Sequence, residues 1–245
     1  MCDMGDAVFE DPRLVAVYDA IEGDRHDLEV YVEIVAELGA RSVLDIGCGT
    51  GTFACLLASR GIDVTAVDPA GASIEFARAR AGADAVRWLQ GDATTLPPLA
   101  VDAAFMTGNV AQVFLTDHDW AATLNGARSA LRPGGHLVFE TRDPTQRGWE
   151  RWTRDLTRTV VDVPGVGVVE DWGELVEVAG SFVTFRSETT FRHEGVIVES
   201  SSTLRFRGRA EIEASLAEAR FQLSGIRDAP DRPGLEFVFV AIRPN

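Results

Sequence analysis

Lysine is absent from this chain of 245 residues, in which every one of the 23 basic residues is arginine. Without a lysine amine the protein cannot form a Schiff base with pyridoxal phosphate or with a carbonyl substrate. It also cannot supply the phosphate-binding lysine of a P-loop or of a protein kinase. The absence therefore excludes several enzyme classes, and we attribute it to the codon usage of the genome.

Positive charge is also scarce overall. The 38 acidic residues give a formal net charge of −15. A protein that neutralises the phosphates of nucleic acids or the headgroups of anionic lipids needs a basic surface. No apolar run approaches the length of a membrane helix. We therefore expect neither a nucleic-acid partner nor a membrane partner.

Cysteine and histidine are too few and too dispersed for a disulfide framework or a zinc site. The three cysteines form no C-x-x-C pair, and the four histidines are scattered (Cys2, Cys48 and Cys55; His26, His118, His136 and His193). We expect no metal site. The first residues, MCDMGDAVFEDP, are acidic where a secretory signal would be basic and then apolar. These features predict a cytoplasmic protein with reduced thiols.

Short apolar runs alternate with helical periodicity as far as residue 141. The expected strands are 42–46, 62–68, 85–90, 101–106 and 136–141, and the expected helices are 28–38, 52–60, 72–80 and 117–131. Thr116 and Asp119 form a capping pair for the last of these helices, and the Arg-Pro-Gly-Gly segment 132–135 is expected to end it. Nearly continuous apolar strands between helices indicate a parallel sheet that is covered on both faces.

A different pattern fills residues 142–207. Residues 183–191 and 196–206 alternate with a period of two around a His-Glu-Gly turn, and 157–163 and 166–178 add two expected strands. The helical rhythm returns with a helix at 210–220 and strands at 221–227 and 235–242. The predicted fold is a doubly wound, mostly parallel, seven-stranded Rossmann-like α/β domain (1–141 and 208–245). An antiparallel β-sheet (142–207) is inserted into it and offers a surface for a homodimer.

The chemistry is concentrated in the segment VLDIGCGTG (43–51), where an apolar strand enters a glycine-rich loop that is followed at once by a helix. The dinucleotide fingerprint G-x-G-x-x-G would place its third glycine at position 52, which is Thr52. Here the glycines are Gly47, Gly49 and Gly51, so the third comes one residue early. That spacing favours a ligand without a pyrophosphate, although an NAD-dependent oxidoreductase stays open as an alternative.

Three acidic residues stand where successive strands are expected to end. Asp45 can orient a ligand ammonium, and Asp68 suits the hydroxyls of a ribose. Asp92 can accept from an adenine amino group, beside the backbone amide of Ala93. Because the carboxyl ends of parallel strands meet at one edge of a sheet, these groups are expected to share one ligand site.

The segments VLDIGCGTG, AVDPA (66–70), QGDA (90–93) and RPGGHLVFE (132–140) resemble the class I S-adenosylmethionine-dependent methyltransferases. The resemblance covers about 25–141 and 209–243. It implies that the three loop glycines contact the methionine portion of S-adenosylmethionine, that Asp68 holds the ribose, and that Asp92 faces the adenine. Residues 18–34 are similar to lid helices of small-molecule methyltransferases, including sugar N-methyltransferases, and the N-terminal lid is expected within 1–40. The expected cofactor set is completed by Tyr18, Arg25, Pro69 and Thr107.

Candidate acceptor residues follow the fourth and fifth strands. Asn109 and Gln112 can orient a polar acceptor, Glu140 and Arg142 lie at the end of the fifth strand, and Trp149 can form a wall. No residue identifies itself as a catalytic base. Because lysine is absent, a base would have to be histidine, tyrosine or a carboxylate, and an anionic acceptor would have to be held by arginine.

We therefore expect in-line transfer of a methyl group to a nitrogen or oxygen nucleophile of a small molecule. A non-catalytic S-adenosylmethionine-binding or dimerisation module is a second alternative. The sequence leaves open the acceptor molecule, the acceptor atom and the oligomeric state.

Overall fold

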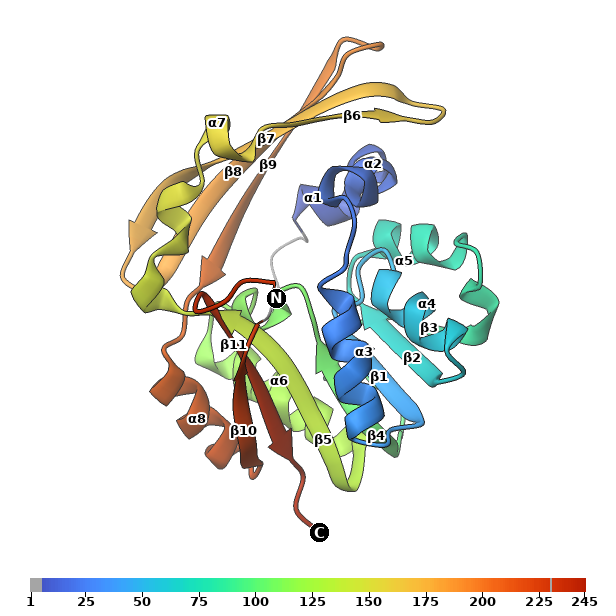
Figure 1. Ribbon diagram of the computed structural model, residues 1–245, viewed down its shortest axis with the longest axis vertical. Helices are drawn as coiled ribbons and strands as arrows, with labels where there is room; N and C mark the ends of the chain where they lie inside the picture. The colour runs from blue at the N-terminus through green and yellow to red at the C-terminus, as the bar shows by residue number, and fades with distance from the viewer. Residues whose placement is uncertain (1–5, 230) are drawn as a thin grey trace.

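The computed structural model describes residues 6–229 and 231–245, which contain two β-sheets (Figure 1). The large sheet has seven strands in the order β10-β11-β5-β4-β1-β2-β3. Their bounds are β1 (Ser42–Ile46), β2 (Asp63–Asp68), β3 (Val86–Gln90), β4 (Val101–Met106), β5 (Leu131–Arg142), β10 (Gln222–Asp228) and β11 (Glu236–Ile242). All neighbours pair in parallel except β11, which is antiparallel to both β5 and β10. The predicted fold class is confirmed.

The strand order changes direction between β1 and β4. The chain adds β2 and β3 on one side of β1 and then crosses to β4 on the other side. Loops on the two sides of such a switch point diverge, so they leave a crevice beyond the carboxyl ends of the strands. The segments that follow β1, β2, β4 and β5 therefore meet at one edge of the large sheet.

Alternating strand residues bury the two faces of the large sheet. Val43 joins a cluster with α3 (Leu28–Glu37), α4 (Thr52–Ser59) and α5 (Gly71–Arg78). Leu44, its neighbour in β1, joins the opposite cluster with α6 (Asp117–Ala130) and α8 (Arg209–Glu218). Burial on both faces explains why these strands read as continuous apolar runs.

The beginning of β5 differs from the sequence prediction. The helix α6 ends at Ala130, and β5 begins at Leu131 rather than at His136. Leu131 pairs with Val101 of β4, and the Gly134 N–H donates to the Arg243 carbonyl oxygen. The Arg-Pro-Gly-Gly segment is therefore part of the strand, because pairing with distant chain segments satisfies its backbone groups.

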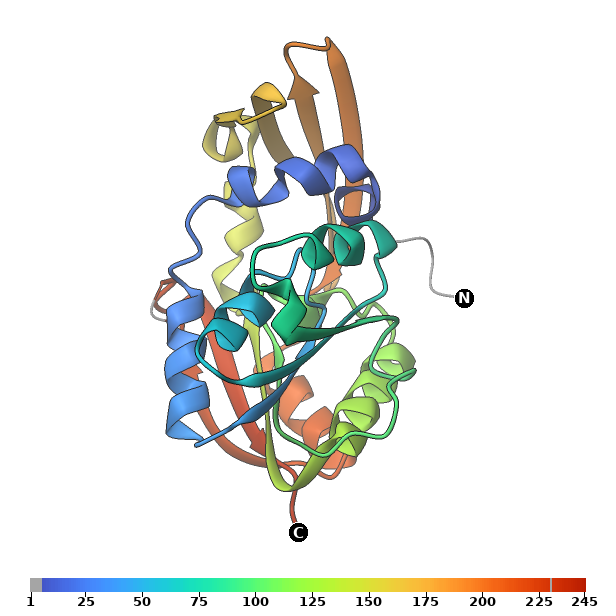
Figure 2. The ribbon, with the colours of Figure 1, turned by 90° about the vertical axis from the view of Figure 1, so that its right-hand side faces the viewer.

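The second sheet is antiparallel, with the order β6-β7-β8-β9. Its strands are β6 (Thr159–Val163), β7 (Gly167–Ala179), β8 (Phe182–Phe191) and β9 (Val196–Arg205), and the short helix α7 (Arg154–Thr157) precedes them. This small sheet arches over the carboxyl edge of the large one (Figure 1). Figure 2 shows α1 (Ala7–Glu10) and α2 (Pro12–Glu22) between the small sheet and α5. Leu14 and Val17 of α2 pack against Val169 and Phe191 of the small sheet.

The N-terminal helices divide into two groups that the sequence did not separate. Tyr31, Ile34 and Val35 place α3 in the main core, against the large sheet. Among the described helices before β1, α1 and α2 lie apart from that core, whereas the predicted lid within 1–40 also includes α3. The division into domains at residues 141 and 208 stays a prediction.

Two further sequence predictions concern membrane helices and the cysteine thiols. In the described part of the chain, no helix combines the length and the apolar character needed to cross a membrane. Cys48 and Cys55 carry free thiols, whereas Cys2 lies outside the described residues.

The cap of α6 gives a first testable prediction. The Thr116 Oγ accepts from the Asp119 N–H at 3.0 Å and donates to the Asp119 carboxylate at 2.7 Å. The Thr116→Ala variant should lower the free energy of unfolding by about 1 kcal/mol, because it leaves an N–H of the first turn without its partner. Urea unfolding measures this change. The Thr116→Ser variant keeps the hydroxyl and should stay near the wild type, and equal losses in both variants would contradict the assignment.

Candidate active site

The glycine loop after β1 needs glycine at its three positions for two different reasons. Gly47, Gly49 and Gly51 all have positive φ, at 73°, 51° and 83°. A Cβ on Gly47 would lie 2.6 Å from a Val110 methyl carbon, and one on Gly51 would lie 2.5 Å from the Trp88 ring. A Cβ on Gly49 would meet nothing within 4 Å. The first and third glycines are thus required by packing, whereas the second exposes backbone to open space where a ligand can lie.

Asp68 fixes the shape of this loop. Its two carboxylate oxygens accept from the Gly49 N–H at 2.8 Å and from the Ala70 N–H at 2.9 Å. Burial raises the pKa of Asp68, and these two backbone donors act in the opposite direction. A carboxylate accepts about four hydrogen bonds, so Asp68 can hold the loop and still receive a hydroxyl of a ligand.

Asp45, at the end of β1, has no such support. Its side chain is buried, and neither carboxylate oxygen has a hydrogen-bond partner among the described residues. Burial, and then the negative charge of Asp68, raise the pKa of Asp45 to about 7, while Arg25 acts to lower it. A buried carboxylate without a partner is unstable unless a cation or a donor approaches. This site therefore fits a ligand that carries a cationic group.

The two N-terminal residues of the expected cofactor set lie on this side of the site. Arg25 forms a two-pronged ion pair with Asp27, with a closest distance of 2.8 Å. Tyr18 is half-buried and its ring lies 5.7 Å from that of Phe9. Arg25 lies near enough to influence the pKa of both Tyr18 and Asp45. The structure thus places Arg25 near both Tyr18 and Asp45.

The other expected cofactor residues line the ends of β2, β3 and β4. Pro69 is exposed directly after Asp68. The Asp92 carboxylate accepts from the Thr94 N–H at 2.8 Å, so it shapes its own loop, and Ala93 is buried beside it. Thr107 is half-buried one residue after β4.

The lid helix α2 is bonded directly to the glycine loop. The Thr50 hydroxyl donates to the Asp19 carboxylate at 2.6 Å, and Arg80, just beyond α5, forms an ion pair with the same carboxylate. One side chain of α2 therefore ties the lid both to the loop and to α5.

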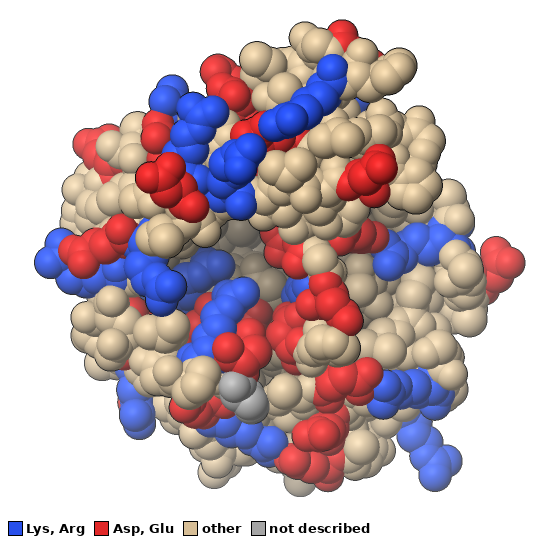
Figure 3. Space-filling model, turned by 45° about the horizontal axis from the view of Figure 1, so that its top comes forward, with Lys and Arg blue, Asp and Glu red and all other residues tan. Residues whose placement is uncertain are grey.

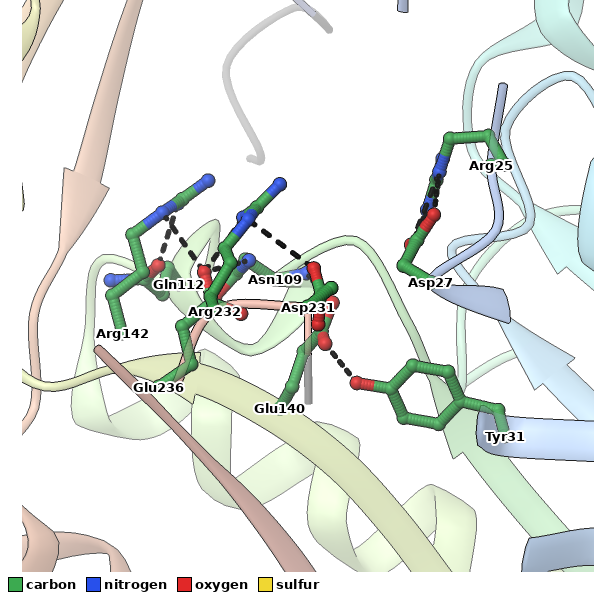
Figure 4. Close-up of polar contacts among 10 residues, drawn as sticks. All are labelled: Arg25, Asp27, Tyr31, Asn109, Gln112, Glu140, Arg142, Asp231, Arg232 and Glu236. Atoms are coloured by element: carbon green, nitrogen blue, oxygen red, sulfur yellow. Dashed lines mark hydrogen bonds and ion pairs between the residues drawn. The ribbon is translucent and has the colours of Figure 1, made fainter. Parts of the chain in front are cut away.

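Glu140 is the centre of the acceptor side (Figure 4). The Tyr31 hydroxyl donates to one of its carboxylate oxygens, and the Asn109 N–H donates to the other at 3.0 Å. Burial raises the pKa of Glu140, the bond from Tyr31 lowers it, and the charge of Glu236 raises it again. Asn109 has a positive φ of 62°, which aims its N–H at Glu140. Glu140 is thus a buried carboxylate with fixed donors.

Glu236 is a second buried carboxylate on this side, and sequence reasoning missed it. It accepts from Arg232 Nη1 at 2.7 Å and from Asn109 Nδ2 at 3.3 Å, and Arg142 Nε lies 3.6 Å away. Arg142 Nη1 donates to Gln112 Oε1 at 2.9 Å. Four of the expected acceptor residues, Asn109, Gln112, Glu140 and Arg142, therefore lie in one network.

Two polar atoms of this network have no partner among the described residues. They are the side-chain amide oxygen of Asn109 (Oδ1) and the side-chain nitrogen of Gln112 (Nε2), both buried. One is an acceptor and the other a donor. The network can therefore complement a ligand group that both donates and accepts hydrogen bonds.

Trp149 does not join this network. Its ring lies 4.7 Å from that of Phe206 and packs in an apolar cluster with Val183 of the small sheet. Trp152 is the tryptophan that lies near the acceptor residues, because the Arg142 guanidinium carbon is 5.6 Å from its ring centre. The positions of Trp149 and Trp152 in the sequence do not show which of the two lies near the acceptor residues.

Two residues of the site, Glu236 and Tyr31, were not predicted because their patterns in the sequence are weak. Glu236 begins an otherwise apolar strand, where a buried carboxylate stands out. Tyr31 follows the apolar pattern of α3, so its hydroxyl gave no separate signal.

The surface of the molecule combines both charges on the face that Figure 3 draws. Figure 3 shows a hollow near the middle of that face, with acidic and basic side chains around it. The acidic chain thus gathers several arginines around its candidate site.

The model of a family described as a methyltransferase domain matches residues 43–135, the segment that contains the glycine loop and the ends of β2 to β4. This part of the chain is therefore similar to a methyltransferase domain. The resemblance seen in the glycine loop and its acidic residues is therefore confirmed.

Individual similar proteins extend this comparison. The chain is 31% identical over 106 residues to the ubiquinone biosynthesis O-methyltransferase of Acinetobacter baylyi, which is 42% of this chain and 44% of that one. It is 29% identical over 150 residues to the biotin biosynthesis bifunctional protein BioHC of Cellvibrio japonicus, which is 57% of this chain and 28% of that one. The chain thus spans less than half the length of these curated relatives.

A solved structure resembles the whole chain. The sugar N-methyltransferase KedS8 of Streptoalloteichus superposes with a TM-score of 0.77 at 21% identity, over 100% of this chain and 97% of that one. At this identity the likeness establishes the fold, including the small sheet that lies beside the methyltransferase domain.

The unpaired carboxylate of Asp45 predicts a particular pH dependence. Its pKa is about 7 in the folded protein, against 3.8 as the ordinary value. Between these pH values the folded state binds more protons than the unfolded state, so this group makes stability fall as the pH rises. The Asp45→Asn variant should match the wild type near pH 4 and exceed its free energy of unfolding by about 4 kcal/mol at pH 8.

Urea unfolding of both proteins over this pH range measures the difference. The difference reports Asp45 together with its electrostatic interaction with Asp68, because the remaining buried carboxylates are common to both proteins. A difference that does not change with pH would show that Asp45 is not protonated in the folded state.

Proposed function

We propose that this protein is an S-adenosylmethionine-dependent methyltransferase that methylates a nitrogen or oxygen nucleophile of a small molecule. The observation that carries the proposal is the unpartnered Asp45 beside a glycine loop with an open backbone face, within a segment that matches the methyltransferase domain. A cofactor with an ammonium and a sulfonium supplies the positive charge that this acidic edge lacks.

The residues present fit the cofactor along the edge of the large sheet. The backbone of the glycine loop (Gly47, Gly49 and Gly51) and Asp45 would hold the methionine portion, with Tyr18, Arg25 and Thr107 around it. Asp68 would accept from the ribose hydroxyls, and Asp92, Ala93 and Pro69 would surround the adenine. The bound cofactor supplies a methyl group on a cationic sulfur, which is already activated for transfer.

The acceptor would lie between this edge and the small sheet. The Glu140 carboxylate and the side-chain oxygen Oδ1 of Asn109 are acceptors of hydrogen bonds, so they can orient an N–H or O–H of the nucleophile. An oriented nucleophile reacts faster because the rotational freedom it would lose is already removed. The small sheet and α2 lie over this edge of the large sheet, where they would limit the access of water to the reacting groups.

Neither acceptor atom is favoured by the similar proteins. The Acinetobacter relative is named as an O-methyltransferase and KedS8 as a sugar N-methyltransferase. The net charge of −15 disfavours a nucleic-acid acceptor, which leaves a small molecule as the favoured acceptor class.

Two measurements test the proposal. Isothermal titration calorimetry should detect binding of S-adenosylhomocysteine, and labelled methyl groups from S-adenosylmethionine should appear on a compound in a panel of amines and alcohols. No binding at saturating cofactor would refute the proposal. Tight binding without transfer to any amine, hydroxyl or carboxyl compound would favour a non-catalytic binding module.

Asp68 provides the sharpest mutational prediction for the cofactor site. The Asp68→Ala variant should weaken S-adenosylhomocysteine binding about tenfold to a hundredfold, because it removes charged hydrogen bonds to the ribose and releases the Gly49 N–H. Asp63 is the matched control, since it begins the same strand at the opposite, exposed edge. The Asp63→Asn variant should bind like the wild type. Unchanged affinity in a folded Asp68→Ala protein would remove the ribose assignment.

A further inference from the structure

Two arginines from distant parts of the chain lie side by side on the acceptor side. Arg142 ends β5, and Arg232 belongs to the loop before β11. Both reach the same carboxylate, because Glu236 accepts from Arg232 Nη1 at 2.7 Å and lies 3.6 Å from Arg142 Nε. In Figure 4 the far ends of the two guanidinium groups point the same way, away from Glu236.

Each guanidinium is held on its inner side only. Arg142 donates Nη1 to Gln112 Oε1 at 2.9 Å and lies against the Trp152 ring. Arg232 Nε lies 3.5 Å from the Asp231 carboxylate. No described residue accepts a hydrogen bond from Nη2 of either arginine. Their side chains are 26% and 46% exposed, so these free N–H groups can be reached from the site.

The charges of the two groups oppose each other. Burial lowers the pKa of Arg142, the charge of Arg232 lowers it further, and Glu236 raises it. Burial also acts to lower the pKa of Arg232, but Glu236, Asp231 and Glu140 raise it overall, so carboxylates already offset the two positive charges. The attraction for a further anion therefore comes from the free guanidinium N–H groups. The guanidinium is the side chain best suited to this task, because its planar fork binds carboxylate and phosphate oxygens in pairs.

We propose that Arg142 and Arg232 bind a carboxylate or phosphate group of the acceptor molecule. This inference rests on the proposed function and narrows its acceptor to a molecule with a nitrogen or oxygen nucleophile and a separate anionic group. The two ends are coupled through the protein, since Asn109 donates to Glu236 through Nδ2 and to Glu140 through its N–H. An anion seated on the arginines thus sets the position of a nucleophile near Glu140.

Calorimetric titration of inorganic phosphate and of acetate, at constant ionic strength in chloride, tests the proposal. The proteins are the wild type, Arg232→Gln and Arg227→Gln, each with and without saturating S-adenosylhomocysteine. Arg227 is the matched control because it is similarly exposed, at 43%, and pairs with Glu37 away from the site. Arg232→Gln suits the test because its half-exposed side chain is not part of the core, and its thermal midpoint verifies folding.

We expect at least one of the two anions to bind the wild type and the Arg227→Gln variant equally, and to bind Arg232→Gln at least about tenfold more weakly. Preference for phosphate or for acetate identifies the anionic group. Absence of binding to the wild type, or equal binding to all three proteins, would overturn the inference. If the wild type binds S-adenosylhomocysteine but neither anion, only this inference fails; if it binds no S-adenosylhomocysteine, the proposed function fails.

Discussion

The hydrogen bonds of the Asp68 carboxylate join the ends of β1 and β2 and fix the glycine loop on which the cofactor side depends. One carboxylate oxygen holds the Gly49 N–H and the other holds the Ala70 N–H. With that geometry set, Gly47 and Gly51 pack closely against Val110 and Trp88, while the face at Gly49 stays open. The loop is thus rigid where it meets the protein and open where it can meet a ligand.

Buried carboxylates divide the site into two unlike halves. Asp45 has no hydrogen-bond partner among the described residues, whereas Glu140 and Glu236 are surrounded by donors from Tyr31 and Arg232 among others. A buried carboxylate without a partner favours the binding of a cationic ligand. A carboxylate that already accepts hydrogen bonds keeps its orientation when a ligand binds. The proposed methyl transfer from a cationic cofactor to a polar acceptor suits this division. Asp45 would meet the positive charge of the cofactor, whereas the groups fixed around Glu140 would orient the acceptor.

Much of the fold, and the residues at the carboxyl edge of the large sheet, could be predicted from local patterns in the sequence. The central strands β1, β2 and β4 read as apolar runs, and glycines or acids stand at or close to their carboxyl ends. The acceptor side could not be predicted in the same way, because its contacts join residues far apart. Tyr31 meets Glu140 across 109 positions, and Asn109 meets Glu236 across 127. The predicted start of β5 was wrong for the same reason, since Gly134 and Gly135 form their backbone hydrogen bonds with the distant Arg243.

The Asp19 side chain makes the two ligand sites mechanically dependent. It bonds α2 to Thr50 in the glycine loop, while Leu14 and Val17 on the same helix pack against the small sheet that covers the acceptor. A helix of eleven residues moves as one body over such a short length. A tilt of α2 away from the small sheet would therefore strain the bond to Thr50 as well as the packing of Leu14 and Val17. Under the proposed function, release of a methylated product and of the spent cofactor would be coupled through this one helix.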